Sequence, residues 1–249
     1  MKNIAAIILA AGKGKRMNSD QPKVLHKIFG QPMIEHLLGT VTSLSISKIV
    51  VVVGHKAELV KSALAHHGDR LDFVLQTEQN GTGHAVLVTE NELADFEGDI
   101  LVMAGDAPFL SARTIENLVE VHHREKAAAT VLSAVPSNAA GYGRVVRLPD
   151  SNLVDFIVEH KDATDEEKLI GEINSGTFCF TSRFLFEALR EIKADNSQGE
   201  YYLTDVMKIL RQKGHKAAFY QVEDADEVLG VNSIEQLADL ENRFAKKIG

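Results

Sequence analysis

The sequence has little of what marks a secreted, membrane-spanning or nucleic-acid-binding protein. A single cysteine, Cys179, excludes a disulfide within the chain, and its apolar setting, T-F-C-F, indicates a core residue in a reducing compartment. No apolar run reaches the ~18 residues that a spanning helix needs. Lys and Arg number 27 against 35 Asp and Glu, and the net charge of −8 argues against a general nucleic-acid or membrane surface. Any phosphate site must therefore be a local basic pocket.

Signals for export and for several common catalytic centres are also missing. The first apolar run, I-A-A-I-I-L-A-A-G, is short, follows only Lys2 and leads into a glycine-rich basic loop rather than a cleavage region. We interpret it as a buried strand and expect a cytoplasmic protein. No G-x-S-x-G or catalytic-cysteine context is present. The adjacent histidines 66/67 and 122/123 should point to different sides of a helix, so we interpret them as surface residues and predict no histidine metal site.

Apolar runs alternate with helical patterns from residue 1 to about 135. Runs such as K-I-V-V-V-V-G lack period-two alternation, as strands covered on both faces do. This predicts an α/β fold with a doubly wound, mostly parallel, Rossmann-like sheet, whose ligands bind outside the carboxyl ends of the strands. The predicted strands are 4–10, 48–53, 71–75, 100–103 and 129–135, and the predicted helices are 32–44, 56–66, 83–93 and 112–125.

The pattern changes after about residue 140. The runs R-V-V-R-L and L-V-D-F-I-V-E flank P-D-S-N and predict an antiparallel hairpin. A charged helical turn, another strand (I-N-S-G-T-F-C-F-T) and a closing helix over 233–247 follow. A chain of 249 residues with 45% hydrophobic content can bury one large core, so we expect a single domain, 1–249. Within it we expect two lobes, 1–135 and 136–249, and the second contains the smaller antiparallel β lobe.

The strongest local motif is L-A-A-G-K-G-K-R at residues 9–16. A strand that ends in a glycine-rich loop with Lys13, Lys15 and Arg16 can bring backbone N–H groups and cations to phosphates. The loop is not a dinucleotide motif, because Met17 stands where a third glycine is needed, and it lacks the G-K-[ST] of a Walker A loop.

Two further segments add charge at the same predicted edge. In D-Q-P-K-V-L, Pro22 fixes the backbone before Lys23, which could reach the loop's phosphates, although alone it would be read as a solvated lysine. In G-D-A-P, Asp106 follows a buried strand, where a carboxylate suits Mg²⁺. Asn232, in G-V-N-S, is either a second metal ligand or a helix N-cap.

The remaining polar segments are individually weaker. Gln76, Gln79 and Gly81, in Q-T-E-Q-N-G-T-G-H-A, could read a nucleobase edge, while the simpler reading is a polar turn with Thr82 as N-cap. In the second half, G-Y-G-R, I-V-E-H-K-D and E-I-N-S-G offer groups for sugar hydroxyls (Glu159, Asn174) or phosphate (Arg144, Lys161). The same residues could form a solvated charge run, and Thr204 could simply start a helix.

Together these motifs resemble one family, the uridylyltransferase domain of bacterial bifunctional N-acetylglucosamine-1-phosphate uridylyltransferase/glucosamine-1-phosphate acetyltransferase. Ordered matches run from residue 7 to about 240. The first loop and G-D-x-P are general to sugar nucleotidyltransferases, whereas Q-T-E-Q-x-G-T-x-H-A, I-V-E-x-K-D-A and Q-G-E-Y-Y-L-T-D are narrower.

The resemblance implies specific roles for residues of both lobes. Contacts to the nucleotide fall to Leu9, Ala10, Ala11 and Gly12, with Arg16 and Lys23 on its phosphates. Contacts to uracil fall to Gln76, Gly81 and Thr82. The ribose and the metal lie by Ala104, Gly105 and Asp106, and Mg²⁺ is bound by Asp106 and Asn232. The sugar phosphate is held by Gly143, Glu159, Asn174 and Thr204.

The sequence also departs from the family. Lys15 stands where threonine is usual, and Ala104 where tyrosine is often found before G-D. The chain stops at Gly249 without the family's C-terminal left-handed β-helix, so we expect no acetyl-CoA chemistry, and a monomer is compatible with the loss of that trimer-forming domain. Whether the chain is an excised domain or a natural single-function enzyme stays open.

The predicted reaction is Mg²⁺-dependent transfer of UMP from UTP to N-acetyl-glucosamine 1-phosphate, by in-line displacement at the α-phosphate, with Arg16, Lys23 and Asp106 as catalytic residues. Three alternatives stay open. The first is the same reaction on another sugar 1-phosphate, such as glucose 1-phosphate. The second is a non-catalytic nucleotide-sugar binding protein, and the third is a nicotinamide-dependent oxidoreductase, which Met17 disfavours.

Overall fold

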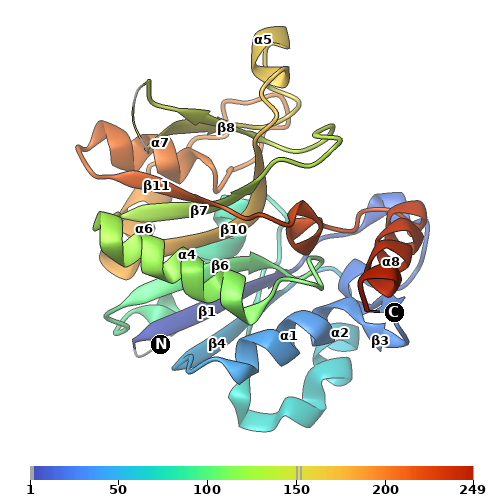
Figure 1. The fold of residues 1–249 in the computed structure, drawn as a ribbon. Coiled ribbons are helices and arrows are strands. Elements are labelled where there is room, and N and C mark those ends of the chain that lie inside the picture. The colour runs from blue at the N-terminus through green and yellow to red at the C-terminus, as the bar shows by residue number, and fades with distance from the viewer. Residues whose placement is uncertain (1–2, 150, 152, 249) are drawn as a thin grey trace.

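A twisted sheet runs through the centre of the molecule (Figure 1), which is a computed structural model describing residues 3–149, 151 and 153–248. Among these residues the sheet has nine strands, seven of them in the order β11-β7-β10-β6-β1-β4-β5, with β8 and β9 joined through β10. The strands are β1 (Ile4–Ala10), β4 (Lys48–Val53), β5 (Asp72–Leu75), β6 (Asp99–Ala104), β7 (Ala129–Ala134), β8 (Arg144–Arg147), β9 (Val154–Val158), β10 (Ile173–Thr181) and β11 (Ala217–Gln221).

The pairing is mostly parallel, as the apolar runs predict. Strand β1 lies between β4 and β6 and is parallel to both, and β5 extends the parallel set. Strand β10 is antiparallel to both of its neighbours, β6 and β7, while β11 pairs parallel to β7. Because β10 lies between β6 and β7, strands from both sides of residue 135 belong to one sheet.

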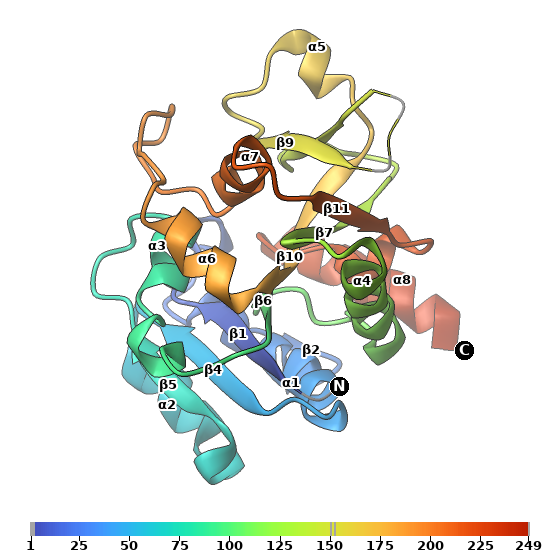
Figure 2. The same ribbon diagram turned by 90° about the vertical axis from the view of Figure 1, so that its left-hand side faces the viewer.

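Helices cover both faces of the sheet, which confirms the doubly wound prediction (Figure 2). Their bounds are α1 (Met33–Ser43), α2 (Ala57–Leu64), α3 (Thr82–Leu87), α4 (Ala112–Glu125), α5 (Asp165–Lys168), α6 (Ser182–Leu189), α7 (Asp205–Gln212) and α8 (Ile234–Ile248). One core contains apolar residues of α1, α2 and α4, and the other contains those of α3, α6 and α7.

The strands lack alternation because alternate residues enter different cores. In β1, Ile4 and Ile8 pack on the side of α1, whereas Ala5 and Ile7 pack on the side of α3. Both faces are therefore dry, and each fully buried isoleucine contributes roughly 1.5–3 kcal/mol to folding. Cys179 is buried in the first core, as predicted, and this burial raises the pKa of its thiol.

A third, smaller cluster holds the last helix. The short hairpin of β2 (Lys27–Ile28) and β3 (Gln31–Pro32) lies beside α8 (Figure 1), and Leu240 packs there with Met17 and Ile28. Phe244 stacks on Phe109 with ring centroids 3.8 Å apart. The expected closing helix is thus confirmed, and it is tied to the segment that follows β1.

Several predicted elements differ in extent. The helix expected over 83–93 ends at Leu87, and a separate 3₁₀ turn, Asn91–Leu93, follows. The helix expected over 56–66 ends at Leu64 and is followed by a 3₁₀ turn, Ala65–Arg70, which is broken at Gly68, where φ 59° and ψ −138° form a backbone conformation that other residues avoid. The hairpin of β8 and β9 is confirmed, and residues 150 and 152 of its turn lie outside the described residues. Helix α6 and strand β11 were not among the predicted elements, whereas α7 begins directly after Thr204, as the alternative reading of that residue as a helix start expects.

The reading of the histidine pairs as surface residues is confirmed for His66 and His123, which are exposed, and is wrong for His122. His122 is only 2% exposed, because it lies on the buried face of α4. Its two ring nitrogens contact the hydroxyls of Thr130 and Thr181 at 2.9 and 3.1 Å, so its polar atoms are satisfied inside the core.

Across residues 3–149, 151 and 153–248, none of the helices has both the length and the apolar character required to cross a bilayer.

Candidate functional site

A pocket of about 630 Å³ lies where β1, β5 and β6 end. This is the edge at which a parallel α/β sheet binds its ligands. Thirteen of the residues singled out from the sequence line it, namely Leu9, Ala10, Ala11, Gly12, Lys13, Lys23, Gln76, Gln79, Gly81, Thr82, Ala104, Asp106 and Lys161. The structure thus brings together segments as far apart in the chain as those of Leu9 and Lys161.

The glycine-rich loop and Lys23 are packed against each other. Gly14 adopts φ +57°, and a Cβ on it would lie 2.8 Å from the Cβ of Lys23. A side chain at position 14 would therefore strain the backbone and displace Lys23. This close approach explains why the loop and the D-Q-P-K-V-L segment form one unit. The side chain of Lys15 lies outside what the structure describes.

Two predicted residues, Asp106 and Asn232, contact the charged ammonium group of a third, Lys23. The ammonium group of Lys23 forms an ion pair with the carboxylate of Asp106 and donates a hydrogen bond of 3.0 Å to Oδ1 of Asn232. The Lys23 and Asp106 side chains are only 18% and 12% exposed. The backbone N–H of Val231 donates to the carbonyl of Asp106 at 3.0 Å, which fixes Asn232 beside this pair.

This arrangement fits a magnesium site. The two proposed ligands already point their oxygens at one cation, here the lysine ammonium, and a carboxylate plus an amide oxygen is a donor set that Mg²⁺ accepts. The amide of Asn232 is thus directed at the cation, while the side-chain oxygen of the next residue, Ser233, accepts a bond from the backbone of Gln236 in the first turn of α8.

Arg16 and Gly105 are placed at the margin of the pocket. Arg16 is exposed in the 3₁₀ turn that follows Gly14. Burial and the charge of Asp106 raise the pKa of Tyr142, and the charge of Arg16 partly opposes this rise. Gly105 lies beneath the pocket, where its N–H donates to the carbonyl of Leu9 at 3.0 Å. Neither lines the cavity itself.

The predicted uracil contacts form a connected polar group. Gln76 is 3% exposed and donates from Nε2 to the carbonyl of Gly81 at 3.2 Å, while Gln79 donates to the Gln76 carbonyl at 3.1 Å. Thr82 is not the N-cap of α3, because Gly81 occupies that position and makes no side-chain cap. The Thr82 hydroxyl instead accepts a bond from the Leu203 N–H at 3.1 Å.

The four residues predicted for the sugar phosphate lie together, in a group that adjoins the pocket without lining it. The Thr204 hydroxyl donates to Oε1 of Glu159 at 3.0 Å, and the Asn174 N–H donates to the Gly143 carbonyl at 3.0 Å. A Cβ on Gly143 would lie 3.4 Å from Oε2 of Glu159. Burial raises the pKa of Glu159, the Thr204 hydrogen bond opposes this, and the charges of nearby Asp205, Asp162 and Glu200 add to the rise.

Residues 6–216 match the family model of the MobA-like NTP transferase domain. The chain belongs to this family.

Curated relatives support the resemblance drawn from the motifs. The chain is 50% identical over 243 residues to the bifunctional protein GlmU of Streptococcus agalactiae serotype V, covering 98% of this chain and 52% of that protein. It is 48% identical over 248 residues to GlmU of Halalkalibacterium halodurans, covering 100% and 54%. The chain therefore spans about half the length of these relatives.

Solved structures show the same fold at low identity. A UDP-glucose pyrophosphorylase complexed with UDP-glucose superposes with a TM-score of 0.76 at 18% identity, over 98% of both chains. A putative glucose-1-phosphate thymidylyltransferase from Bacillus anthracis in complex with sucrose superposes with a TM-score of 0.77 at 20% identity, over 96% of this chain and 94% of that one. These two structures bear on the architecture alone.

Further residues of this NTP transferase domain line the pocket but were not selected from the sequence. They are Gly14, Val24, Ala85, Gln198 and Glu200. Most lie inside the motifs quoted above, so the motifs located the pocket but did not show which of their residues line it. Val24 and Ala85 are apolar and carry no signal in sequence, and Glu200 reaches the pocket only because the segment before α7 docks on Gly81.

Proposed function

We propose that this chain transfers UMP from UTP to N-acetylglucosamine 1-phosphate, giving UDP-N-acetylglucosamine and pyrophosphate. The observation that carries the proposal is the convergence of Lys23, Asp106 and Asn232 beside the glycine-rich loop. Membership of an NTP transferase family supports nucleotidyl transfer, and the half-length match to GlmU supports UTP and the N-acetylated sugar.

The sugar 1-phosphate is already an anion, so its attack on the α-phosphorus needs no general base. The protein's contribution is then positioning and charge stabilisation. The loop at residues 9–12 would hold the nucleotide phosphates, with Lys23 and Arg16 opposing the negative charge that builds on them. Mg²⁺, when bound by Asp106 and Asn232, supplies further neutralisation of the phosphate oxygens.

Lys23 would have two states in this scheme. Its ammonium group now contacts both oxygens that the metal requires. A divalent cation and an ammonium group cannot share one position, so metal binding would release the lysine toward the adjacent phosphates. Glycine at position 14 leaves room for the lysine stem to turn.

Recognition of the two substrates would divide between the two lobes. In lobe 1–135, Gln76, Gly81 and Thr82 would hold uracil, with Ala104 and Gly105 by the ribose. In lobe 136–249, the sugar phosphate would be held by Gly143, Glu159, Asn174 and Thr204. The hydrogen bond between Thr204 and Glu159 supports this second part, because it orients a buried carboxylate that can accept from sugar hydroxyls.

The direct test is pyrophosphate release. The protein is incubated with UTP, Mg²⁺ and either N-acetylglucosamine 1-phosphate, glucose 1-phosphate or no sugar phosphate, with EDTA controls. We expect release that requires both the metal and the N-acetylated sugar phosphate. Faster pyrophosphate release with glucose 1-phosphate would make that sugar phosphate the substrate. UTP binding without pyrophosphate release under any condition would indicate a binding protein.

A further inference from the structure

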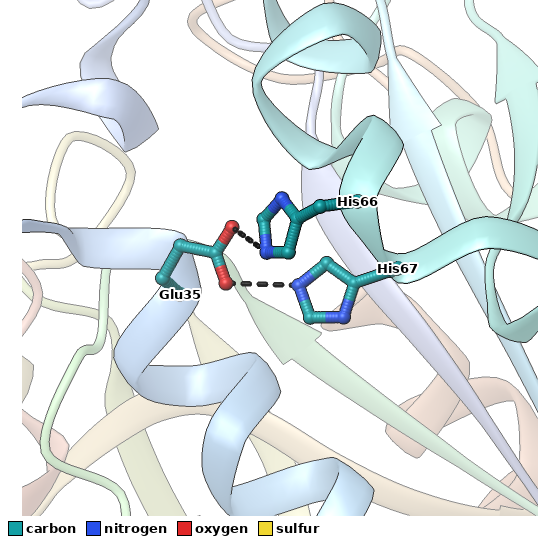
Figure 3. Close-up of side chains that lie close together, drawn as sticks. All are labelled: Glu35, His66 and His67. Atoms are coloured by element: carbon teal, nitrogen blue, oxygen red, sulfur yellow. Dashed lines mark hydrogen bonds and ion pairs between the residues drawn. The ribbon is translucent and has the colours of Figure 1, made fainter.

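Three potential metal ligands converge outside the pocket, on Glu35, His66 and His67 (Figure 3). Glu35 lies in the first turn of α1, and the histidines lie in the 3₁₀ turn Ala65–Arg70 that follows α2. Oε1 of Glu35 is 3.3 Å from Nε2 of His66, and Oε2 is 2.9 Å from Nε2 of His67. Within the described part of the chain, no other trio of His, Cys, Asp or Glu brings its ligand atoms within 4.8 Å of one another.

The convergence corrects the expectation that adjacent histidines diverge. That expectation assumes a regular α-helix, in which neighbouring side chains point about 100° apart. Here the α-helix ends at Leu64, and Gly68 breaks the following turn. The two imidazole rings therefore lie side by side, with centroids 4.3 Å apart and planes inclined by 38°.

The chemistry of the trio calls for a shared cation. The Glu35 side chain is only 9% exposed, and a buried carboxylate requires a positive partner or hydrogen-bond donors. Nδ1 of His66 lies 3.2 Å from the carbonyl of Ala63, which can only accept, so Nδ1 carries the proton in this contact. In the neutral ring, Nε2 then presents a lone pair to a carboxylate oxygen, an unfavourable contact unless a proton or a metal ion lies between them.

We propose that Glu35, His66 and His67 bind a zinc ion. Two imidazole nitrogens and one carboxylate oxygen are a preferred Zn²⁺ donor set, and the 3.3 Å between Nε2 of His66 and Oε1 of Glu35 suits bonds of about 2.0–2.1 Å in a tetrahedron. The bond from His66 to Ala63 is the kind of outer contact that fixes the tautomer of a metal-binding histidine. The His66 side chain is 63% exposed, so a water molecule completes the tetrahedron.

The site is distinct from the proposed transfer reaction. A zinc ion there joins the start of α1 to the turn that leads into β5, and β5 ends immediately before Gln76 of the pocket. Its role is therefore that of a structural clip, whose occupancy stabilises the fold.

A second histidine pair in the same chain provides a matched control. His122 and His123 both contact Asp99, at 3.4 and 2.6 Å, yet His122 is buried and both of its nitrogens are engaged by threonine hydroxyls. Like the proposed zinc site, this group consists of two histidines and one carboxylate, but the nitrogens of His122 are already bonded and are not available to a metal ion. His123 is exposed, so its removal changes the histidine count and leaves the proposed zinc site intact.

The test is metal binding to the untagged, EDTA-treated protein in the presence of excess Mg²⁺, which occupies the carboxylate and amide oxygens of the pocket. Calorimetry is used with Zn²⁺, and visible absorption with Co²⁺. We expect one Zn²⁺ per chain, Co²⁺ bands typical of tetrahedral coordination and a higher melting temperature with zinc. His66→Ala and His67→Ala should each weaken binding at least tenfold, and His123→Ala should leave it unchanged.

Two results would overturn the proposal. One is the absence of stoichiometric binding by the wild type, which would mean that the trio shares only protons. The other is equal affinity in the wild type and in both histidine variants, which would place the zinc elsewhere. His66 is exposed, so His66→Ala keeps the test valid if a change at the more buried His67 prevents folding.

Discussion

Lys23 is the residue on which the proposed chemistry depends most. It is part-buried, it lies against Gly14, and it neutralises a carboxylate that would otherwise face an amide oxygen with no cation between them. In the proposed reaction, the same three groups would form an ion-paired cluster without ligands and a metal site with them. The lysine would then compete with the metal before the reaction and assist the phosphates during it.

Replacing Lys23 by alanine should separate these two effects. Turnover should fall by about 10²–10³-fold, the usual loss when a group that stabilises developing charge is removed. Binding of Mn²⁺ without nucleotide should become tighter, because the competing ammonium group is gone; electron paramagnetic resonance of the free Mn²⁺ measures it. Lys13→Ala, which removes another cation of the same pocket, should change Mn²⁺ affinity less. A parallel loss of turnover and metal affinity in Lys23→Ala would show that the lysine organises the site instead.

Glu159→Gln tests the buried carboxylate of the second lobe. Because the folded-state pKa of Glu159 is raised above its ordinary value of 4.5, the native state binds the proton more tightly than the unfolded chain does. The charged form therefore lowers stability at neutral pH, and this penalty disappears as the pH falls to about 4.5. The variant should melt higher than the wild type at pH 7, with the difference shrinking toward pH 4.5.

The same variant should bind the sugar phosphate less well. Glutamine keeps one acceptor oxygen but loses the charge, and a hydrogen bond to a neutral acceptor is weaker than one to a charged acceptor by about 1–1.5 kcal/mol, or roughly 5–10-fold in KM for the sugar phosphate. Thermal melts across pH and initial rates measure the two effects. A variant that melts lower than the wild type at pH 7 and equals it at pH 4.5 would contradict the assigned cause.

At the scale of elements, the pocket depends on segments that dock backbone to backbone. Gly81 precedes α3 with φ +107°, and a Cβ on it would lie 2.6 Å from the carbonyl oxygen of Tyr201. The N–H of Gly83 donates to that carbonyl at 2.7 Å. Residues 198–205 are thereby held against the proposed uracil site.

Gly81→Ala and Gly199→Ala form a matched pair for this contact. Both glycines have positive φ, so both alanine variants carry backbone strain, but a Cβ on Gly199 meets open space. Gly81→Ala should be less stable than Gly199→Ala by about 1–3 kcal/mol, the usual effect of an added methyl group in a packed site. It should also raise KM for UTP. Equal stability in chemical denaturation would show that the docking of this segment contributes nothing measurable.

Helix α8 positions Asn232 from outside the sheet. Leu240 is 3% exposed in the cluster with Met17 and Val231, and Val231 immediately precedes the proposed metal ligand. Leu240→Ala should lower stability by about 2–5 kcal/mol and raise the Mg²⁺ concentration needed for half-maximal turnover. Denaturation and a Mg²⁺ titration measure these. An unchanged Mg²⁺ requirement would mean that Asn232 keeps its place without α8 packing.

At the scale of the whole molecule, one sheet joins both lobes. Strand β10 carries Asn174 and Gly176 near its start, and a Cβ on Gly176 would lie 3.8 Å from the Cβ of Ala104 at the end of β6. The antiparallel insertion therefore brings the proposed sugar-phosphate residues to the edge that carries the glycine-rich loop. A ligand that spans both lobes bridges parts of a single sheet.

The sequence predicted the first half of this architecture better than the second. Continuous apolar runs such as 48–53 indicate strands that are buried on both faces. The motifs around Lys23, Asp106 and Asn232 located the three residues that contact one another in the pocket. The apolar run of β10 is the same for either strand direction, so its antiparallel insertion was not readable. The burial of His122 and the pocket contact of Glu200 depend on tertiary contacts, which residue type alone does not reveal.

The most direct measurement is to follow which phosphorus of UTP reaches the sugar. The protein is supplied with N-acetylglucosamine 1-phosphate, Mg²⁺ and UTP radiolabelled at either the α- or the γ-phosphorus, and the products are separated. We expect the α-label to appear in UDP-N-acetylglucosamine and the γ-label in pyrophosphate, each dependent on Mg²⁺. Label from the γ-position in a sugar product, or α-label that stays in UTP under all conditions, would contradict the proposed reaction.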